Sequence, residues 1–159
     1  MIFITVGTQL AFDRMIQPLD QYCQQHPELE VFAQIGASDF SPMYMQFEKF
    51  ITPAEAEDKM KHASLIIAHA GMGSILTALD FQTPIIVMPR KASLGEHRNE
   101  HQLATCDWVK DLNGVTVAQD EIELIALLED FNRSDDSISI EPYAEQSLLE
   151  FLAHEISGA

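Results

Sequence analysis

Hydrophobic residues in this chain alternate between short continuous runs and helically spaced stripes. The continuous apolar or β-branched runs at residues 2–6, 65–68 and 84–88 are typical of strands buried on both faces of a parallel sheet. Further strands are expected at residues 30–35, 44–51 and 115–117, the second of them from a weaker pattern. Helices are expected at residues 12–25, 53–62, 73–81, 96–111 and 120–131. This alternation predicts an α/β fold, a parallel sheet with helices on both faces.

Local signals mark the ends of two of these helices. In the run Thr52-Pro53-Ala54-Glu55, Thr52 is the expected N-cap, Pro53 takes the first helical position and Glu55 completes a capping box. Asn113 and Gly114 follow the helix expected at residues 96–111 and are typical of a helix end.

The chain is expected to form one domain, a linker and a last helix. Residues 1–131 hold the alternating strands and helices, enough chain for a single core. Residues 132–141 include the polar run NRSDDSIS and are interpreted as a linker. Residues 142–159 are interpreted as an amphipathic helix that begins at Pro142, with an apolar stripe at Leu148, Leu149, Leu152 and Ile156. This helix packs either on its own domain or on a partner.

The turn at residues 69–74, HAGMGS, lies where a buried strand ends and a helix begins. In an open parallel sheet, ligands bind at this edge. Gly71 and Gly73 allow a close approach of the backbone, and a helix start offers unpaired N–H groups with a partial positive charge. The turn therefore suits a phosphate group.

Composition narrows the class of ligand and partner. The net charge of −16 argues against nucleic acid and against anionic membrane surfaces. No apolar run is long enough to span a bilayer, and residues 1–7 read as a strand rather than a signal peptide. Cys23 and Cys106 lie far apart without metal-ligand spacing, which favours reduced thiols in the cytosol.

A local cluster of basic residues stands out against this acidic background. Arg90, Lys91 and Arg98 fall within nine positions, and His97 and His101 lie beside them. The cluster directly follows the strand–turn–helix–strand unit of residues 64–89. It is a candidate for the positive charge that an anion site needs in a chain of this composition.

Several motifs together resemble the C-terminal domain of family 28 glycosyltransferases. They are Gly7-Thr8 and Phe12-Asp13 near the start, HAGMGS at 69–74, MPR at 88–90 and EHRNEHQ at 96–102. The resemblance covers residues 1–130 and is closer to the stand-alone small-subunit type. That type includes the eukaryotic small subunit of the UDP-GlcNAc transferase acting on dolichol-linked precursors, and bacterial capsule or exopolysaccharide transferase subunits, which look nearest.

The resemblance implies a Rossmann-like domain that forms the donor half of a GT-B enzyme. It implies a UDP-sugar as donor substrate, with no tightly bound cofactor, and inverting transfer to a lipid-linked sugar. The acceptor would be held by a separate, membrane-anchored subunit, which places this chain in the cytoplasm at the inner face of the membrane. The catalytic base would lie on that partner, and the isolated chain would have little activity.

The resemblance also implies residue roles. His69 and Arg98 would stabilise the leaving UDP. The donor itself would be held by Gly7, Thr8, Gly71, Met72, Gly73, Ser74, Glu96, His97, Asn99, His101 and Gln102. Each has an ordinary alternative: Ser74 as a plain N-cap, His69 bonded to a loop carbonyl, and residues 96–102 as a solvated helix start.

Other candidate chemistry in the sequence is weaker. His97 and His101 are spaced like a zinc pair, but Arg98 stands where a zinc protease needs Glu, so no metal is expected. Asp13 suits a helix start as well as a general base. In related enzymes a ribose-binding carboxylate follows the glycine turn; here Thr77 stands there, and Asp80 is the nearest substitute.

Two alternative functions stay open from the sequence. One is a non-catalytic enhancer or stabiliser of a partner glycosyltransferase, which would not bind the donor. The other is a nucleotide-binding regulatory domain of flavodoxin-like topology, which would have no membrane-bound partner. The donor sugar, the acceptor and the oligomeric state are not encoded in any motif.

Overall fold

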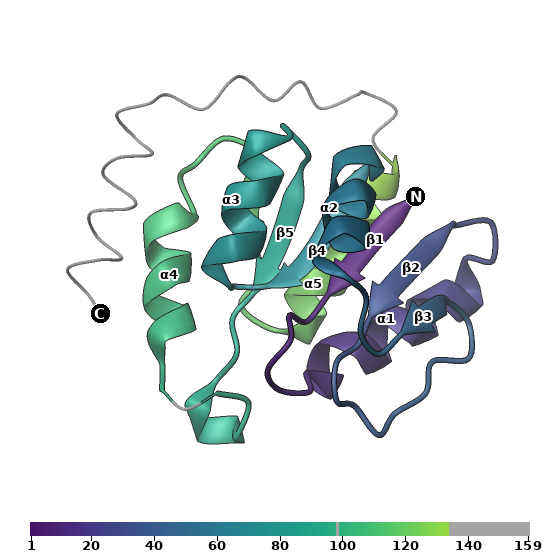
Figure 1. Cartoon of the computed structure of the whole chain (residues 1–159), viewed down its shortest axis with the longest axis horizontal. Coiled ribbons are helices and arrows are strands. Elements are labelled where there is room, and N and C mark those ends of the chain that lie inside the picture. Colours follow the sequence, from purple (N-terminus) through teal and green to yellow (C-terminus); the bar gives the residue numbers. More distant parts are fainter. Residues whose placement is uncertain (98, 134–159) are drawn as a thin grey trace.

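The protein is built on a parallel sheet of six strands, seen in a computed structural model that describes residues 1–97 and 99–133 (Figure 1). The strands are β1 (Ile2–Thr5), β2 (Val31–Gln34), β3 (Gln46–Glu48), β4 (Leu65–His69), β5 (Ile85–Met88) and β6 (Val115–Val117). The helices are α1 (Asp13–Gln25), α2 (Pro53–His62), α3 (Met72–Asp80), α4 (His101–Val109) and α5 (Glu121–Arg133), with a 3₁₀ turn η1 (Ala92–Leu94).

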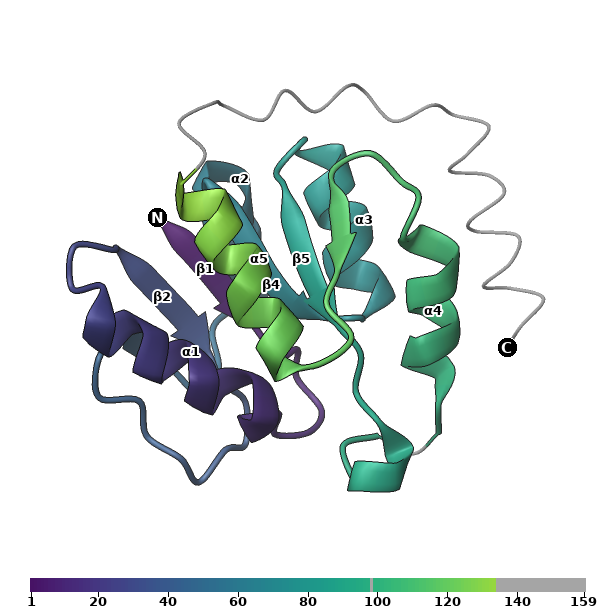
Figure 2. The same ribbon diagram turned by 180° about the vertical axis from the view of Figure 1, so that it is seen from behind.

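Helices cover both faces of the sheet. Figure 1 shows α2 and α3 in front of the strands with α4 beside α3, and Figure 2 shows α1 and α5 on the opposite face. The first face is sealed by apolar side chains that include Phe3, Ile66 and Ile75, and the second by a cluster that includes Ile4, Ile16 and Leu128. The predicted α/β fold with helices on both faces is confirmed.

The strand order is β3-β2-β1-β4-β5-β6, with every neighbouring pair parallel. This is the order of the Rossmann fold. The chain moves outward from β1 to β3, returns to pair β4 with β1, and then moves outward the other way. The loops after β1 and β4 therefore diverge at adjacent strand ends, and this switch point is where open sheets of this kind leave a crevice for a ligand.

Two predicted elements differ from those observed. The helix expected from residue 96 begins only at His101, and the strand expected at residues 44–51 is reduced to Gln46–Glu48 at the edge of the sheet. The Asn99 side chain accepts a hydrogen bond from the His101 N–H at 2.8 Å, and the Glu96 side chain is held by distant residues. With these side-chain contacts in place, residues 96–100 stay outside the helix and α4 is shorter than expected. The predicted linker from residue 134 and the helix at 142–159 lie outside the described residues.

The predicted helix start at Thr52 is confirmed in detail. The Thr52 hydroxyl accepts from the Glu55 N–H at 3.1 Å, and the Glu55 carboxylate accepts from the Thr52 N–H at 2.9 Å. Hydrogen bonding to the Thr52 backbone, and next to the Thr52 side chain, lowers the pKa of Glu55. The capping box fixes α2 between β3 and β4, upstream of the turn that carries the candidate chemistry.

Candidate functional site

A pocket of about 330 Å³ opens at the switch point between β1 and β4. Three segments that each follow a strand meet in it: the loop after β1, the turn after β4 with the start of α3, and the segment from β5 into α4. Its lining residues are Val6, Gly7, Thr8, Gln9, His69, Ala70, Gly71, Met72, Gly73, Ser74, Arg90, His97, His101, Gln102 and Thr105. Most of the residues that the sequence singles out are thus brought together.

The start of α3 presents free backbone donors to this pocket. The N-cap is Gly71, which makes no side-chain capping bond, so the interpretation of Ser74 as N-cap is wrong. The first backbone N–H groups of a helix have no partner within it, and those of Met72, Gly73 and Ser74 belong to residues that line the pocket. A Cβ built on Gly73 would meet no atom within 4 Å, so this backbone is open to a ligand.

Gly71 has a different purpose from Gly73. A Cβ at Gly71 would lie 2.1 Å from Cε1 of His69, and one at Gly7 would lie 2.7 Å from Nε2 of the same ring. The imidazole therefore fills the space beside both glycines, and its Nε2 lies between them. Gly7 also has a φ of +75°, a conformation that glycine adopts without steric cost. Gly7 and Gly71 therefore make room for the His69 side chain, whereas the sequence suggested only that a glycine here lets a ligand approach closely.

The His69 ring is neutral at physiological pH. Burial, followed by repulsion from Arg90 and His97, lowers the pKa of His69 from its ordinary value of 6.5 to about 4. Its Nδ1 lies 3.1 Å from the side-chain amide of Gln102, so the interpretation of a bond to a loop carbonyl is wrong. A neutral imidazole supplies one N–H donor and one acceptor, not a charge.

Arg90 is a buried cation in the pocket wall, with only 2% of its surface exposed. Its guanidinium donates to the carbonyls of Val6, Leu10 and Ala11, at 2.7 Å for Leu10 and 2.9 Å for Ala11, and to the backbone carbonyl of Glu96 at 3.2 Å. It also lies 4.9 Å from the centre of the Phe12 ring. Burial lowers the pKa of Arg90. Arg90 shapes the loop after β1 and brings positive charge to the pocket.

The sequence places Arg90 in the basic cluster but does not mark it as a residue that holds the donor. Its position directly after β5, at the edge where the pocket lies, is the signal that points to it. Thr105, one turn into α4, was missed altogether.

A buried amide holds the glycine turn after β1 from the other side. Gln34 Nε2 donates to the carbonyls of Gly7 and Lys49, each at 2.9 Å, and Gln34 Oε1 accepts from the Thr5 hydroxyl at 2.7 Å. The same Thr5 oxygen accepts from the Gly7 N–H at 3.2 Å. The turn is therefore preorganised, since the strands beneath it fix its backbone.

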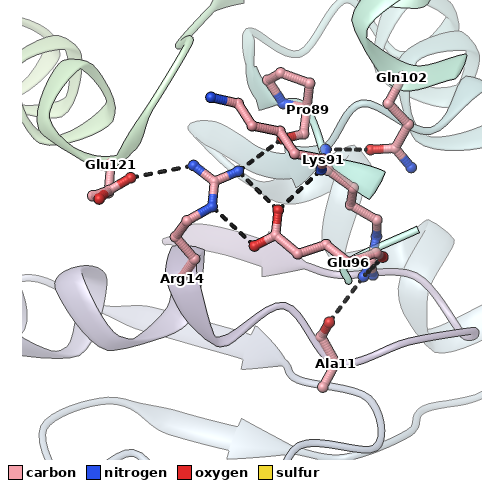
Figure 3. A network of polar contacts seen from close by, with 8 residues as sticks. Ala11, Arg14, Pro89, Lys91, Glu96, Gln102 and Glu121 are labelled. Atoms are coloured by element: carbon pink, nitrogen blue, oxygen red, sulfur yellow. Dashed lines mark hydrogen bonds and ion pairs between the residues drawn. The ribbon is translucent and has the colours of Figure 1, made fainter. Parts of the chain in front are cut away.

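Glu96 is part of an ion-pair network and does not line the pocket (Figure 3). Both of its carboxylate oxygens accept from Arg14, at 2.9 Å each, and Oε1 also accepts from the Lys91 N–H at 3.0 Å. Arg14 donates further to Glu121 at 3.2 Å and to the Pro89 carbonyl at 3.0 Å. The contacts with the two carboxylates, the bond to Glu96 foremost and then those to Glu121, raise the pKa of Arg14. The network ties α1, the segment after β5 and α5 together.

The remaining candidates are placed as follows. Asn99 does not line the pocket, His97 and His101 do, and Arg98 lies outside the described residues. The Thr77 hydroxyl bonds back to the Gly73 carbonyl at 2.8 Å, while Asp80 is exposed at the end of α3. The Asp13 carboxylate accepts a hydrogen bond from the Ser38 hydroxyl, so one of its oxygens is engaged in a structural contact.

Within residues 1–97 and 99–133, no three His, Cys, Asp or Glu side chains gather closely enough to hold a metal ion. Both cysteines are free and buried, and burial raises the pKa of Cys23 to about 11 and that of Cys106 to about 12. No described helix has the length and hydropathy needed to cross a bilayer.

Known proteins with a similar sequence or fold bear on this pocket. The family model of the glycosyltransferase family 28 C-terminal domain matches residues 1–153. No protein of curated function matches the sequence.

Many solved structures have a similar fold, among them these three. The glycosyltransferase of kitacinnamycin is 15% identical with a TM-score of 0.64; the match covers 98% of this chain but only 39% of that one. ALG13 is 20% identical with a TM-score of 0.64, covering 95% and 93%. The C-terminal CMP-Kdo binding domain of WaaA from Acinetobacter baumannii is 12% identical with a TM-score of 0.56, covering 100% and 90%. At these identities the likeness shows the fold alone.

Proposed function

We infer the function of this protein from one premise: its chain belongs to the family of glycosyltransferase family 28 C-terminal domains. We propose that the switch-point pocket binds the diphosphate of a nucleotide-sugar donor, a UDP-sugar. The observation that carries the proposal is the uncapped start of α3, which shares the pocket with the glycine turn after β1, the partly buried His69 and the buried Arg90.

The charge distribution supports an anionic ligand in spite of the acidic chain. With a net charge of −16, the protein as a whole repels anions. In the pocket, however, the partial positive charge at the start of α3 and the buried guanidinium of Arg90 act at short range. Because the pocket wall excludes water from Arg90, this attraction is screened less than that of a surface charge.

The geometry also suits departure of a nucleotide. In inverting transfer the acceptor hydroxyl attacks the sugar carbon, the sugar–phosphate bond breaks, and negative charge develops on the leaving diphosphate. Fixed donors that meet this charge lower the barrier. In our proposal these donors are the N–H groups of residues 72–74 and the Nε2–H of His69. Arg98, outside the described residues, would add a guanidinium.

We further propose that the acceptor is a lipid-linked sugar held by a separate, membrane-anchored subunit, in the assembly of a capsular or exopolysaccharide repeat unit. The resemblance to stand-alone small subunits supports this, as does the match that covers 93% of ALG13. The protein would then act in the cytoplasm at the inner face of the membrane, and the base that activates the acceptor would lie on the partner.

Calorimetry with UDP and UDP-sugars tests donor binding. We expect saturable binding of UDP by the purified chain, and binding weakened about tenfold or more by Gly73→Ala, whose methyl group takes space beside the free N–H groups. Inorganic phosphate should bind far more weakly than UDP. Absence of UDP binding would favour the enhancer function over the donor-binding one.

A transfer assay tests the requirement for a partner. We expect the purified chain to leave a lipid-linked acceptor unglycosylated, and the chain combined with its membrane-anchored partner to glycosylate it. Robust transfer by the chain alone would refute the two-subunit proposal while leaving donor binding intact.

A further inference from the structure

A short chain of hydrogen bonds links the segment after β5 to the candidate histidine. The Arg90 backbone N–H donates to Gln102 Oε1 at 2.9 Å, and Gln102 Nε2 lies 3.1 Å from Nδ1 of His69. Gln102 is buried, with 5% of its surface exposed, and it comes from the first turn of α4.

The direction of these bonds follows from chemistry. A backbone N–H only donates, so the Gln102 atom that faces Arg90 is the carbonyl oxygen. The opposite end of the amide is then the NH₂ group, which also only donates. His69 Nδ1 must accept from it, and an accepting Nδ1 carries no proton. The proton of the neutral ring is therefore on Nε2.

We propose that Gln102 is a positioning residue that holds His69 as the Nε2–H tautomer, so that the ring presents a neutral hydrogen-bond donor between Gly7 and Gly71. The pairing of this donor with a diphosphate rests on the proposed function. The tautomer itself does not, because it follows from the contacts of Arg90, Gln102 and His69.

The groups around the ring favour the neutral form. The loop after β1 and the turn after β4 contribute Gly7, Gly71 and backbone, without a titratable side chain beside the ring. From the other side, the cation Arg90 and the imidazoles of His97 and His101 share the pocket. Since these neighbours are positive or neutral and none of the described residues that line the pocket is a carboxylate, protonation of His69 is disfavoured, in line with its lowered pKa.

This role differs from the one the sequence suggested for Gln102. The family resemblance implies that Gln102 holds the donor directly. In the structure its oxygen and one side of its NH₂ group are already engaged by protein atoms. Gln102 would therefore act on the ligand through His69.

Nitrogen-15 NMR of the histidine rings tests the tautomer in the intact protein. The His69 signals are assigned by their loss in His69→Gln. At pH 7 we expect a protonated Nε2 and a bare Nδ1 in the wild type. A protonated Nδ1, or a mixture of the two tautomers, would overturn the inference, and this measurement requires no change at Gln102.

A charge variant sharpens the same test. In Gln102→Glu the carboxylate can only accept, so Nδ1 of His69 should gain a proton. The matched control Gln24→Glu adds the same charge at an exposed position near the end of α1 and should leave the ring signals unchanged. A folded Gln102→Glu protein whose Nδ1 stays bare would contradict the inference.

UDP affinity then tests the consequence for binding. Gln102→Met should weaken UDP binding about fivefold, as expected for one hydrogen bond. In a His69→Ala background the same substitution should change the affinity less than about twofold, because the ring it orients is gone. An equal loss in both backgrounds would contradict action through His69. If wild-type protein fails to bind UDP, the proposed function fails, while the tautomer is still decided by the NMR result.

Discussion

Replacing Gly71 with alanine isolates a steric contact on which the site geometry depends. The Gly71 backbone has φ −88° and ψ 138°, values that alanine adopts freely, so the substitution brings no backbone strain. Its added Cβ would lie 2.1 Å from Cε1, 2.6 Å from Nε2 and 2.9 Å from Nδ1 of His69. All three distances are well inside van der Waals contact, so the ring must move.

The cost of that movement can be estimated. His69 is wedged beside Gly7 as well as Gly71 and is bonded to Gln102, so displacement breaks the 3.1 Å contact to the amide. Overpacking of this kind typically costs about 1–3 kcal/mol. For a chain of this size, each kcal/mol lowers Tm by about 2–4 °C.

Urea denaturation of a double-mutant cycle provides the assay. Gly71→Ala should destabilise the wild type by the amount above, but should cost almost nothing in a His69→Ala background, where the ring is absent. Gly73→Ala is the matched control in the same turn: with no atom within 4 Å, its stability should be unchanged or raised by up to about 1 kcal/mol. A Gly71→Ala protein as stable as wild type, or equally destabilised in both backgrounds, would refute the reasoning.

Three further predictions concern the groups around the pocket. Arg90→Lys should destabilise the protein by about 2–4 kcal/mol, measured by urea denaturation. An ammonium cannot reach all four carbonyls, which belong to the loop after β1 and to residue 96. An unchanged urea midpoint would contradict the role of Arg90 in holding this loop. Glu96→Gln should destabilise the protein by about 1–3 kcal/mol, because it weakens the bidentate contact with Arg14, and should leave UDP affinity within about threefold. If Glu96 instead contacted the nucleotide-sugar donor, the substitution would weaken UDP binding and leave stability nearly unchanged. The contribution of His69 to stability should be full above pH 6.5 and decline toward about pH 4, because the unfolded chain, with the ordinary pKa of 6.5, takes up the proton first. The unfolding free energies of wild type and His69→Gln should therefore run parallel above pH 6.5, and their difference should change only between about pH 6.5 and 4; parallel curves throughout would contradict this.

Much of the fold could be predicted because its signals are local. The continuous apolar runs that became β1, β4 and β5 are typical of strands buried on both faces, and the capping box at Thr52 fixes the start of α2 within a few residues. The turn at residues 69–74 was placed correctly because a strand, two glycines and a helix follow one another directly.

The parts that could not be predicted depend on contacts between distant residues. From the sequence, Glu96 was expected to lie in a helix and to contact the nucleotide-sugar donor, but its carboxylate is bound by Arg14, 82 positions away in the sequence. From the sequence, Arg90 was expected only to be one of several basic residues in a cluster, but its guanidinium is bound by carbonyls of the loop after β1. The purpose of Gly71 was hidden for the same reason, because the ring it accommodates is placed by Gln102 from another element.

Mapping UDP on the folded protein by amide chemical shifts tests the central claim most directly. We predict saturable shifts, on titration with UDP, concentrated at the amides of residues 7–9 and 72–74, where the glycine turn after β1 meets the uncapped start of α3. A titration that leaves these amides unmoved would contradict the account. So would shifts gathered elsewhere, as at the apolar groove between α5 and the sheet that is lined by Leu65, Leu127 and Phe131.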